Sequence, residues 1–425
     1  MSGPVQSSMN GRRPTGLAGV RRNLSLDLVG AVGIGITSAV VGALLPAIAR
    51  QGGLVPLGIA ALATAPFIAN LLSAFAGRVG PRTTGQFALI RVIGALSLVV
   101  LALVGHPIVA VLAAILYWIS ISFTVPLQTR FWGAMYPSSS RGRVIGLVGT
   151  GKAAAAGLAA VTVGLVADHA GAPLGMTIAG ALGAGCALAA LGLRVSTAEA
   201  PRRYSAREAV RVLSNHRALK PMMLGQALYG GGMIAASPLY ALVYVDRLHL
   251  PLSEVGTIAV FGAIATTVSY VGWGMLVDRR GGIFALRAGS LLGVASLALY
   301  MVAPDLRLLW VAALASGLAS AAIDLGIQGS IQKHVPLEDR APAMAGWNAL
   351  TGARGVAAPI ISSALVQSGV VDLSTGLLLC LVPAALGAIV YFRSETSALP
   401  ATARRELPAA QPGRLVTRLR SLPSR

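Results

Sequence analysis

Three ionisable residues, Asp324, Arg354 and Lys152, stand deep inside long apolar stretches of the sequence. A charged side chain there costs about 2.5–3.5 kcal/mol to insert into a membrane, so each is a candidate for binding a solute or a proton. Asp324 and Arg354 lie at similar depth on consecutive stretches, which predicts that they pair. A buried carboxylate beside a guanidinium can exchange that partner for a proton or a substrate; a purely structural ion pair is the alternative.

Lys152 is almost the repeat-equivalent of Arg354, which favours two cations facing a shared cavity over a lysine that extends to the membrane surface. Two further charges, Asp27 and Arg91, are less deeply placed. Asp27 is expected in the first turn of the first apolar stretch, where a carboxylate suits a helix N-terminus. We therefore expect Asp27 to cap that helix, with a proton or cation role as the alternative. Arg91 is expected to extend its guanidinium to the membrane surface.

The composition identifies the environment that must position these residues. The 425-residue chain is 55% hydrophobic and only 11% charged, against roughly 25% charged residues in soluble proteins. Its mean hydropathy is +0.74. This composition excludes a water-soluble enzyme, and two cysteines exclude a disulfide-rich scaffold. The chain is predicted to be an all-α integral membrane protein.

The apolar residues form twelve stretches of the length that a membrane-spanning helix requires, about 20 residues. These stretches are continuously apolar, whereas strands of a membrane barrel alternate apolar and polar residues. The expected spans are 24–46, 54–76, 84–105, 107–129, 144–167, 173–193, 222–245, 255–277, 284–303, 308–331, 343–367 and 373–392.

The basic residues alternate between the two sides of these spans. Of 34 Lys and Arg residues, 26 fall in the tails and even-numbered loops, and three (Arg50, Arg247 and Arg307) fall in the loops of the other side. The positive-inside rule then predicts a multi-pass protein of the inner or plasma membrane with both termini in the cytoplasm. Orientation and attraction to anionic lipid explain the net charge of +20. We expect no nucleic acid partner, because the basic residues are dispersed.

The sequence repeats itself at an offset of about 200 residues. Residues 73–80 correspond to 274–281, residues 137–141 to 336–340, and Thr150-Gly151 to Thr351-Gly352. This repeat indicates a duplicated six-helix unit. The predicted organisation is a cytoplasmic tail (1–23), a six-helix bundle (24–195), a linker with a short amphipathic helix (196–220), a second bundle (221–393) and a basic cytoplasmic tail (394–425).

Gly274, Asp278, Arg279 and Gly281 form a loop signature after the eighth span. With twelve spans and a cytoplasmic middle loop, the chain resembles the major facilitator superfamily over about residues 24–393. The resemblance implies that these four residues form a gating loop; the first-half copy departs from the signature at Ser73 and Gly77. It also implies a central cavity surrounded by spans 1, 4, 7 and 10. The other candidate solute-contacting residues are Tyr117, Trp118, Tyr229, Gln328 and Asn70.

We therefore expect a secondary active transporter that moves a small organic solute by alternating access, coupled to protons, and acts as a monomer. Lys152 and Arg354 favour an anionic or zwitterionic solute. Proton-driven efflux of amphipathic drugs is the alternative, although drug-antiporter relatives carry a proline in span 5 that residues 149–164 lack. A non-transporting receptor or scaffold is an alternative of another class. The sequence from Gly146 to Ala153 resembles a phosphate-binding loop but lacks its hydroxyl residue, so we expect no nucleotide to bind there. We expect no cofactor, no metal and no enzyme activity, because the five histidines are scattered and no catalytic set of residues is present.

Overall fold

The computed structural model describes residues 17–72, 83–136, 138–195, 206–216, 219–336 and 339–394, and within these ranges the chain is helical. The first half contains α1 (Leu17–Ala39), the π-helical segment η1 (Val40–Leu44), α2 (Leu45–Gln51), α3 (Pro56–Leu72), α5 (Thr84–Val104), α6 (Pro107–Met135), α7 (Ser138–Ala170), α8 (Ala172–Ala187) and the 3₁₀ segment η3 (Leu188–Gly192). After the linker helix α9 (Ala206–Asn215), the second half contains α10 (Lys220–Leu242), the π-helical segment η5 (Val243–Arg247), α11 (Leu252–Arg280), α12 (Gly282–Val302), α13 (Leu306–His334), α14 (Arg340–Gln367) and α15 (Leu373–Arg393).

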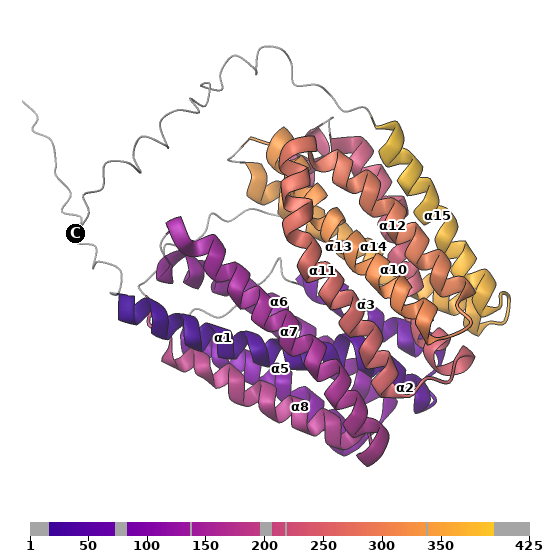
Figure 1. Ribbon diagram of the computed structural model, residues 1–425, viewed down its shortest axis with the longest axis horizontal. Helices are drawn as coiled ribbons and strands as arrows, with labels where there is room; N and C mark the ends of the chain where they lie inside the picture. Colours follow the sequence, from indigo (N-terminus) through magenta and orange to yellow (C-terminus); the bar gives the residue numbers. More distant parts are fainter. Residues whose placement is uncertain are drawn as a thin grey trace, which may run out of the picture.

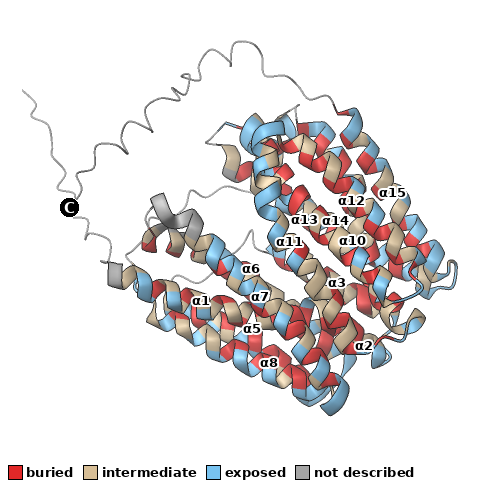
Figure 2. Ribbon diagram, in the orientation of Figure 1, coloured by how far each residue is buried: buried red, intermediate tan, exposed pale blue. Residues whose placement is uncertain are grey.

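Eleven of the described helices are long and apolar enough to cross a membrane. The shorter apolar helix α3 occupies the position of the second expected span, and the residues that follow it, 73–82, lie outside the described part. Exposed residues, in pale blue, occur along the helices of both halves (Figure 2). Many of them are large apolar side chains, among them Leu103, Leu158 and Val268. Such an apolar surface suits lipid.

Short polar residues and glycines set the ends of several helices. Thr83 accepts a hydrogen bond from the Gln86 N–H (3.2 Å) at the start of α5. Asp305 and Asp372 do the same for α13 and α15, each at 3.1 Å. These side chains satisfy N–H groups that the first helical turn leaves unpaired. The linker helix α9 packs against α14.

The two halves repeat the same contacts. Ser97 of α5 donates to the Ala113 carbonyl of α6 (3.1 Å), and Ser296 of α12 donates to the Ala312 carbonyl of α13 (2.7 Å). Both members of the second pair lie 199 residues after those of the first. The π-helical segments also recur, since η1 follows α1 and η5 follows α10. The fold is thus two pseudo-symmetric six-helix bundles.

The two bundles lean together at one end and diverge toward the other, where α1 begins and α15 ends (Figure 1). We call these the closed end and the open end. At the closed end α7 and α11 are so close that a Cβ at Gly164 would lie 2.7 Å from the Leu252 carbonyl oxygen. Toward the open end, Gly149 of α7 and Gly272 of α11 have nothing within 4 Å of such a Cβ. The helices of the two halves therefore form a wedge.

Candidate functional site

The fourth span of the second half carries an exposed polar stripe. Ser320, Asp324, Gln328 and Gln332 follow one another at four-residue intervals on α13, and all four are exposed. Residues four apart lie on the same helix face. Because polar groups in a membrane span face protein or a water-filled space, this stripe indicates the side of α13 that is turned away from lipid. Both residues of this helix that the sequence analysis predicts to contact solute or protons, Asp324 and Gln328, belong to this stripe.

Tyr270 of α11 lies beside this stripe and was not anticipated from the sequence. Its hydroxyl donates to the Asp324 carboxylate at 2.9 Å. Tyr270 comes 14 residues after Gly256, which packs directly against Ala160 of the other half. Fourteen residues are nearly four helical turns, so Tyr270 lies on the face of α11 that is turned toward the first half. The Tyr270–Asp324 pair therefore belongs to the surface between the halves.

Lys152 lies on the opposing surface. It precedes Ala156 by one turn of α7, and Ala156 packs in one apolar cluster with Ala259 of α11. The Lys152 side chain is exposed and makes no hydrogen bond or ion pair with any residue that the structure describes. Lys152 of one half and Asp324 of the other thus lie on facing surfaces. Both lie between the contact of α7 with α11 and the open end.

Arg354 occupies a different place, between α14 and α10. Its Nη1 donates to the Gln226 carbonyl oxygen (2.8 Å), its Nη2 donates to Thr351 Oγ1 (3.2 Å), and the guanidinium lies 6.0 Å from the centre of the Trp347 ring. Its Nε is buried and has no partner among the described residues. The predicted pair with Asp324 is wrong for this conformation, because α13 packs against α11 and α12 and makes few contacts with α14.

A second polar network lies inside the first bundle. Asp27 of α1 accepts hydrogen bonds from Trp132 Nε1 (2.6 Å) and the Tyr136 hydroxyl (3.3 Å). Arg91 of α5 donates to Thr124 and, at 3.3 Å, to Gln128 Oε1. Thr124, Gln128, Trp132 and Tyr136 succeed one another at four-residue intervals, so one face of α6 connects the carboxylate to the guanidinium. That spacing could have revealed the network from the sequence.

This network corrects two expectations. The helix α1 begins at Leu17, so Asp27 lies almost three turns inside it and caps nothing. Arg91 is only 6% exposed and points into the bundle rather than to the membrane surface. A cavity of about 40 Å³ adjoins both side chains. It has room for about three water molecules, and Arg91, one of its lining residues, has a buried Nη1 without a partner among the described residues.

The aromatic candidates divide between packing and exposed positions. The Tyr117 hydroxyl is buried and accepts from Thr37 Oγ1 (3.1 Å), and Tyr229 is buried between α12 and α15. Trp118 is half-buried, contacts the Tyr117 ring edge-on and lies over Gly42 of the π-helical segment η1. Asn70 is exposed on α3 and accepts from Ser122 Oγ at 3.5 Å. Trp118 and Asn70 therefore fit a solute-facing position, whereas Tyr117 and Tyr229 lie within the bundles.

The expected gating loop lies at the open end. Asp278 and Arg279 are exposed and form no hydrogen bond or ion pair with any part of the chain that the structure describes. Gly274 has open space around it, and Gly281 has a φ of 85°, which favours glycine. The first-half counterpart, around Gly77, lies outside the described residues.

The model of the Major Facilitator Superfamily matches residues 28–304 and 222–423. The chain belongs to this superfamily. It is a multi-pass membrane protein of the fold that the resemblance predicted. No curated protein sequence matches it significantly.

Solved structures of the superfamily share this fold. The nucleoside transporter NupG superimposes with a TM-score of 0.70 and 14% identity over 88% of this chain and 98% of its own. A bacterial homolog of the human lysosomal transporter Spinster, inward-facing and unoccupied, gives 0.61 and 15% identity over 90% and 98% of the two chains. The human organic anion transporter MFSD10 gives 0.61 and 14% identity over 88% and 99%. At these identities the likeness establishes the fold.

Proposed function

We propose that this protein is a secondary active transporter that moves a small organic solute by alternating access and couples that movement to protons. The observation that carries the proposal is the placement of ionisable side chains on facing surfaces of the two bundles. Asp324, hydrogen-bonded by Tyr270, lies on one surface, and Lys152 lies on the other. Each is expensive to keep in a membrane, and Lys152 has no structural partner among the described residues that would account for it.

We assign the proton-linked role to Asp324. An exposed carboxylate between the bundles can change partner as the bundles rock, from a proton to a cation or a substrate. Asp27 is less suited, because Trp132 and Tyr136 already donate to its carboxylate inside the first bundle. The positive-inside distribution supports an orientation in which the open end and both tails face the cytoplasm, in an inner or plasma membrane.

We propose an anionic or zwitterionic solute. Lys152 and Arg354 supply two cations, and Arg354 has a buried Nε without a partner among the described residues. Arginine recognises carboxylate and phosphate groups through such donors. Gln328 and Ser320 extend the polar stripe along α13 and add neutral hydrogen-bonding groups for the rest of the solute.

The test is counterflow in proteoliposomes with a panel of radiolabelled solutes. The panel contains organic anions, amino acids, nucleosides and amphipathic cations; nucleosides are included because NupG is a nucleoside transporter. We expect exchange of an anionic or zwitterionic solute and accumulation driven by a pH gradient. Preferred exchange of amphipathic cations would instead support drug efflux, and no exchange across the panel would favour a receptor or scaffold.

The Asp324→Asn variant tests the proton assignment. We expect it to keep counterflow and to lose accumulation driven by the pH gradient. Asp305→Asn is the matched control, because Asp305 makes a local helix cap outside the spans. Normal pH-dependent accumulation by Asp324→Asn would overturn the assignment.

A further inference from the structure

The closed end is held by side chains of each half that cap helices of the other. Asp168, at the end of α7, accepts hydrogen bonds from the first N–H groups of α11, at Leu252 (2.8 Å) and Ser253 (2.9 Å). Gln367, at the end of α14, accepts from the Leu57 N–H at the start of α3 (2.9 Å). In each case the capping residue and the capped helix belong to different bundles.

These two caps are related by the internal repeat. Gln367 follows Asp168 by 199 residues, the same spacing that relates Ser97 to Ser296. The helices that carry them, α7 and α14, are the fifth spans of their halves, and the capped helices, α11 and α3, are the second spans. The fifth span of each half therefore caps the second span of the other.

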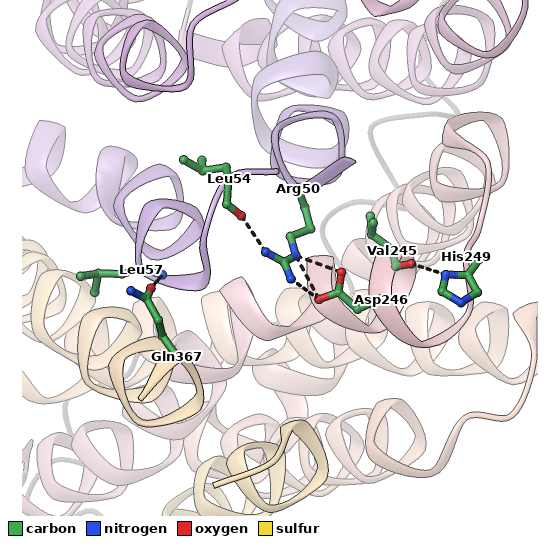
Figure 3. Close-up of polar contacts among 7 residues, drawn as sticks. All are labelled: Arg50, Leu54, Leu57, Val245, Asp246, His249 and Gln367. Carbon is green, nitrogen blue, oxygen red and sulfur yellow. Dashed lines mark hydrogen bonds and ion pairs between the residues drawn. The ribbon is translucent and has the colours of Figure 1, made fainter. Parts of the chain in front are cut away.

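An ion pair completes this set of contacts (Figure 3). The Arg50 Nε donates to both carboxylate oxygens of Asp246 (2.9 and 3.0 Å), and its Nη2 lies 2.8 Å from Oδ2. Arg50 also donates through Nη1 to the Leu54 carbonyl oxygen (2.9 Å), which fixes its direction. Arg50 follows the π-helical segment of the first half, and Asp246 lies within that of the second.

We infer that Asp168, Gln367 and the Arg50–Asp246 pair form a latch that sets the resting conformation of the carrier. The inference rests on alternating access, as proposed above, since every one of these contacts must break when the closed end opens. A helix N-terminus carries unpaired N–H groups and a partial positive charge, which an anionic side chain stabilises more than a neutral one. Asp168 is charged and accepts from two N–H groups, whereas Gln367 is neutral and accepts from one. Asp168 is therefore the stronger of the two caps.

The experiment measures the two ends separately by distances between spin labels in liposomes. Labels at His106 and Val370 report on the closed end, and labels at Ser25 and Gln332 report on the open end, in a background with Cys186→Ala and Cys380→Ala. All four labelled positions are exposed, and each pair joins one half to the other. The wild type is expected to show a short closed-end distance and a long open-end distance.

The variants are ranked by the chemistry of each cap. Asp168→Ala is expected to shift the ratio of the two conformations about tenfold toward the one in which the closed end has separated. Gln367→Ala is expected to shift it about threefold in the same direction, in keeping with the effect of losing a helix cap. Gln367→Glu adds a charge to the second cap and is expected to shift the ratio the other way. This opposite effect does not depend on weakening the protein.

The matched controls are Asp305→Ala and Asp372→Ala. Both residues cap helices at the same end of the molecule, but each cap lies within one half. They are expected to leave both distance distributions as in the wild type. The latch is overturned if Asp168→Ala leaves the distributions unchanged, or if Asp305→Ala shifts them equally. Distances report conformation without transport, so a carrier that failed every uptake assay would still give a valid result.

Discussion

The hydroxyl of Tyr270 and the carboxylate of Asp324 lie 2.9 Å apart on neighbouring spans of the second bundle, and both side chains are exposed. This contact lies within one half, so rocking of the halves need not break it. The carboxylate therefore keeps one neutral donor while its other surroundings change. Tyr270 can therefore hold the Asp324 carboxylate in one orientation while that carboxylate exchanges a proton for a cation or a substrate.

Tyr270→Phe should change the pH dependence of uptake. The lost hydroxyl stabilises the ionised carboxylate, and a hydrogen bond to a charged group contributes about 1.5 kcal/mol or more. We expect the pH profile to move toward alkaline pH by about one unit. Tyr300→Phe makes the same atomic change at a buried contact with Tyr244 and serves as control. Superimposable profiles for wild type and Tyr270→Phe would contradict a role for the hydroxyl.

Arg354→Gln should weaken the binding of an anionic solute selectively. Loss of a charged donor is expected to raise KM for anions by about tenfold or more, with a smaller effect on neutral solutes. Arg354→Lys keeps the charge but lacks the planar fork that reaches Gln226 and Thr351, so its KM should be intermediate. The control is Arg287→Gln, because Arg287 donates to the carbonyl oxygens of Tyr391 and Ser394 at the end of α15. Equal KM changes for anions and neutral solutes would speak against the assignment.

Asp27→Asn should reduce stability. It removes the charge of the buried carboxylate that accepts hydrogen bonds from Trp132 and Tyr136, and a hydrogen bond to a charged group contributes about 1.5–3 kcal/mol. We expect a lower Tm in detergent. Adding Arg91→Gln to Asp27→Asn should cost less than the sum of the two single changes, since the residues share one network. Lys152→Gln is the control. If its Tm were as low as that of Asp27→Asn, the loss of stability would not be specific to the network.

Gly256→Val should force the closed end apart. A Cβ at this position already meets the Ala160 carbonyl oxygen of α7, and overpacking of this kind costs about 1–3 kcal/mol. A cysteine placed at buried Ala39, in the apolar cluster between the halves, should then react about tenfold faster with a membrane-impermeant maleimide. Gly272→Val, which enters open space, should leave the rate unchanged. Equal labelling rates for the two valine variants would show that overpacking at Gly256 does not open the closed end.

Hydrophobic length and the internal repeat were sufficient to predict the helices and the two bundles. Both signals depend on many residues, so an error at one position changes little. The deep placement of Asp324 and Lys152 was also predictable, because charges are rare inside apolar stretches. What they contact was not, since contacts depend on which helix faces meet.

The incorrect pairing of Asp324 with Arg354 illustrates that difference. Consecutive spans are neighbours along the chain, but α13 packs against α11 and α12. Asp27 was misplaced because α1 extends to Leu17, through a polar segment with no apolar signal. Tyr270 gave no signal at all, because a single tyrosine near the end of a span is ordinary. Gln128 could have been found from the four-residue spacing on α6.

The π-helical segments η1 and η5 precede or contain the two residues of the ion pair, Arg50 and Asp246. Each residue of an α-helix turns the chain by about 100°, whereas a wide π turn holds one extra residue and leaves the helix beyond it pointing in nearly the same direction. An insertion or deletion in the first span that no wide turn absorbs would therefore rotate Arg50 by about 100°, away from its carboxylate. The contact between the two residues thereby constrains the number of residues in the first span and in the seventh.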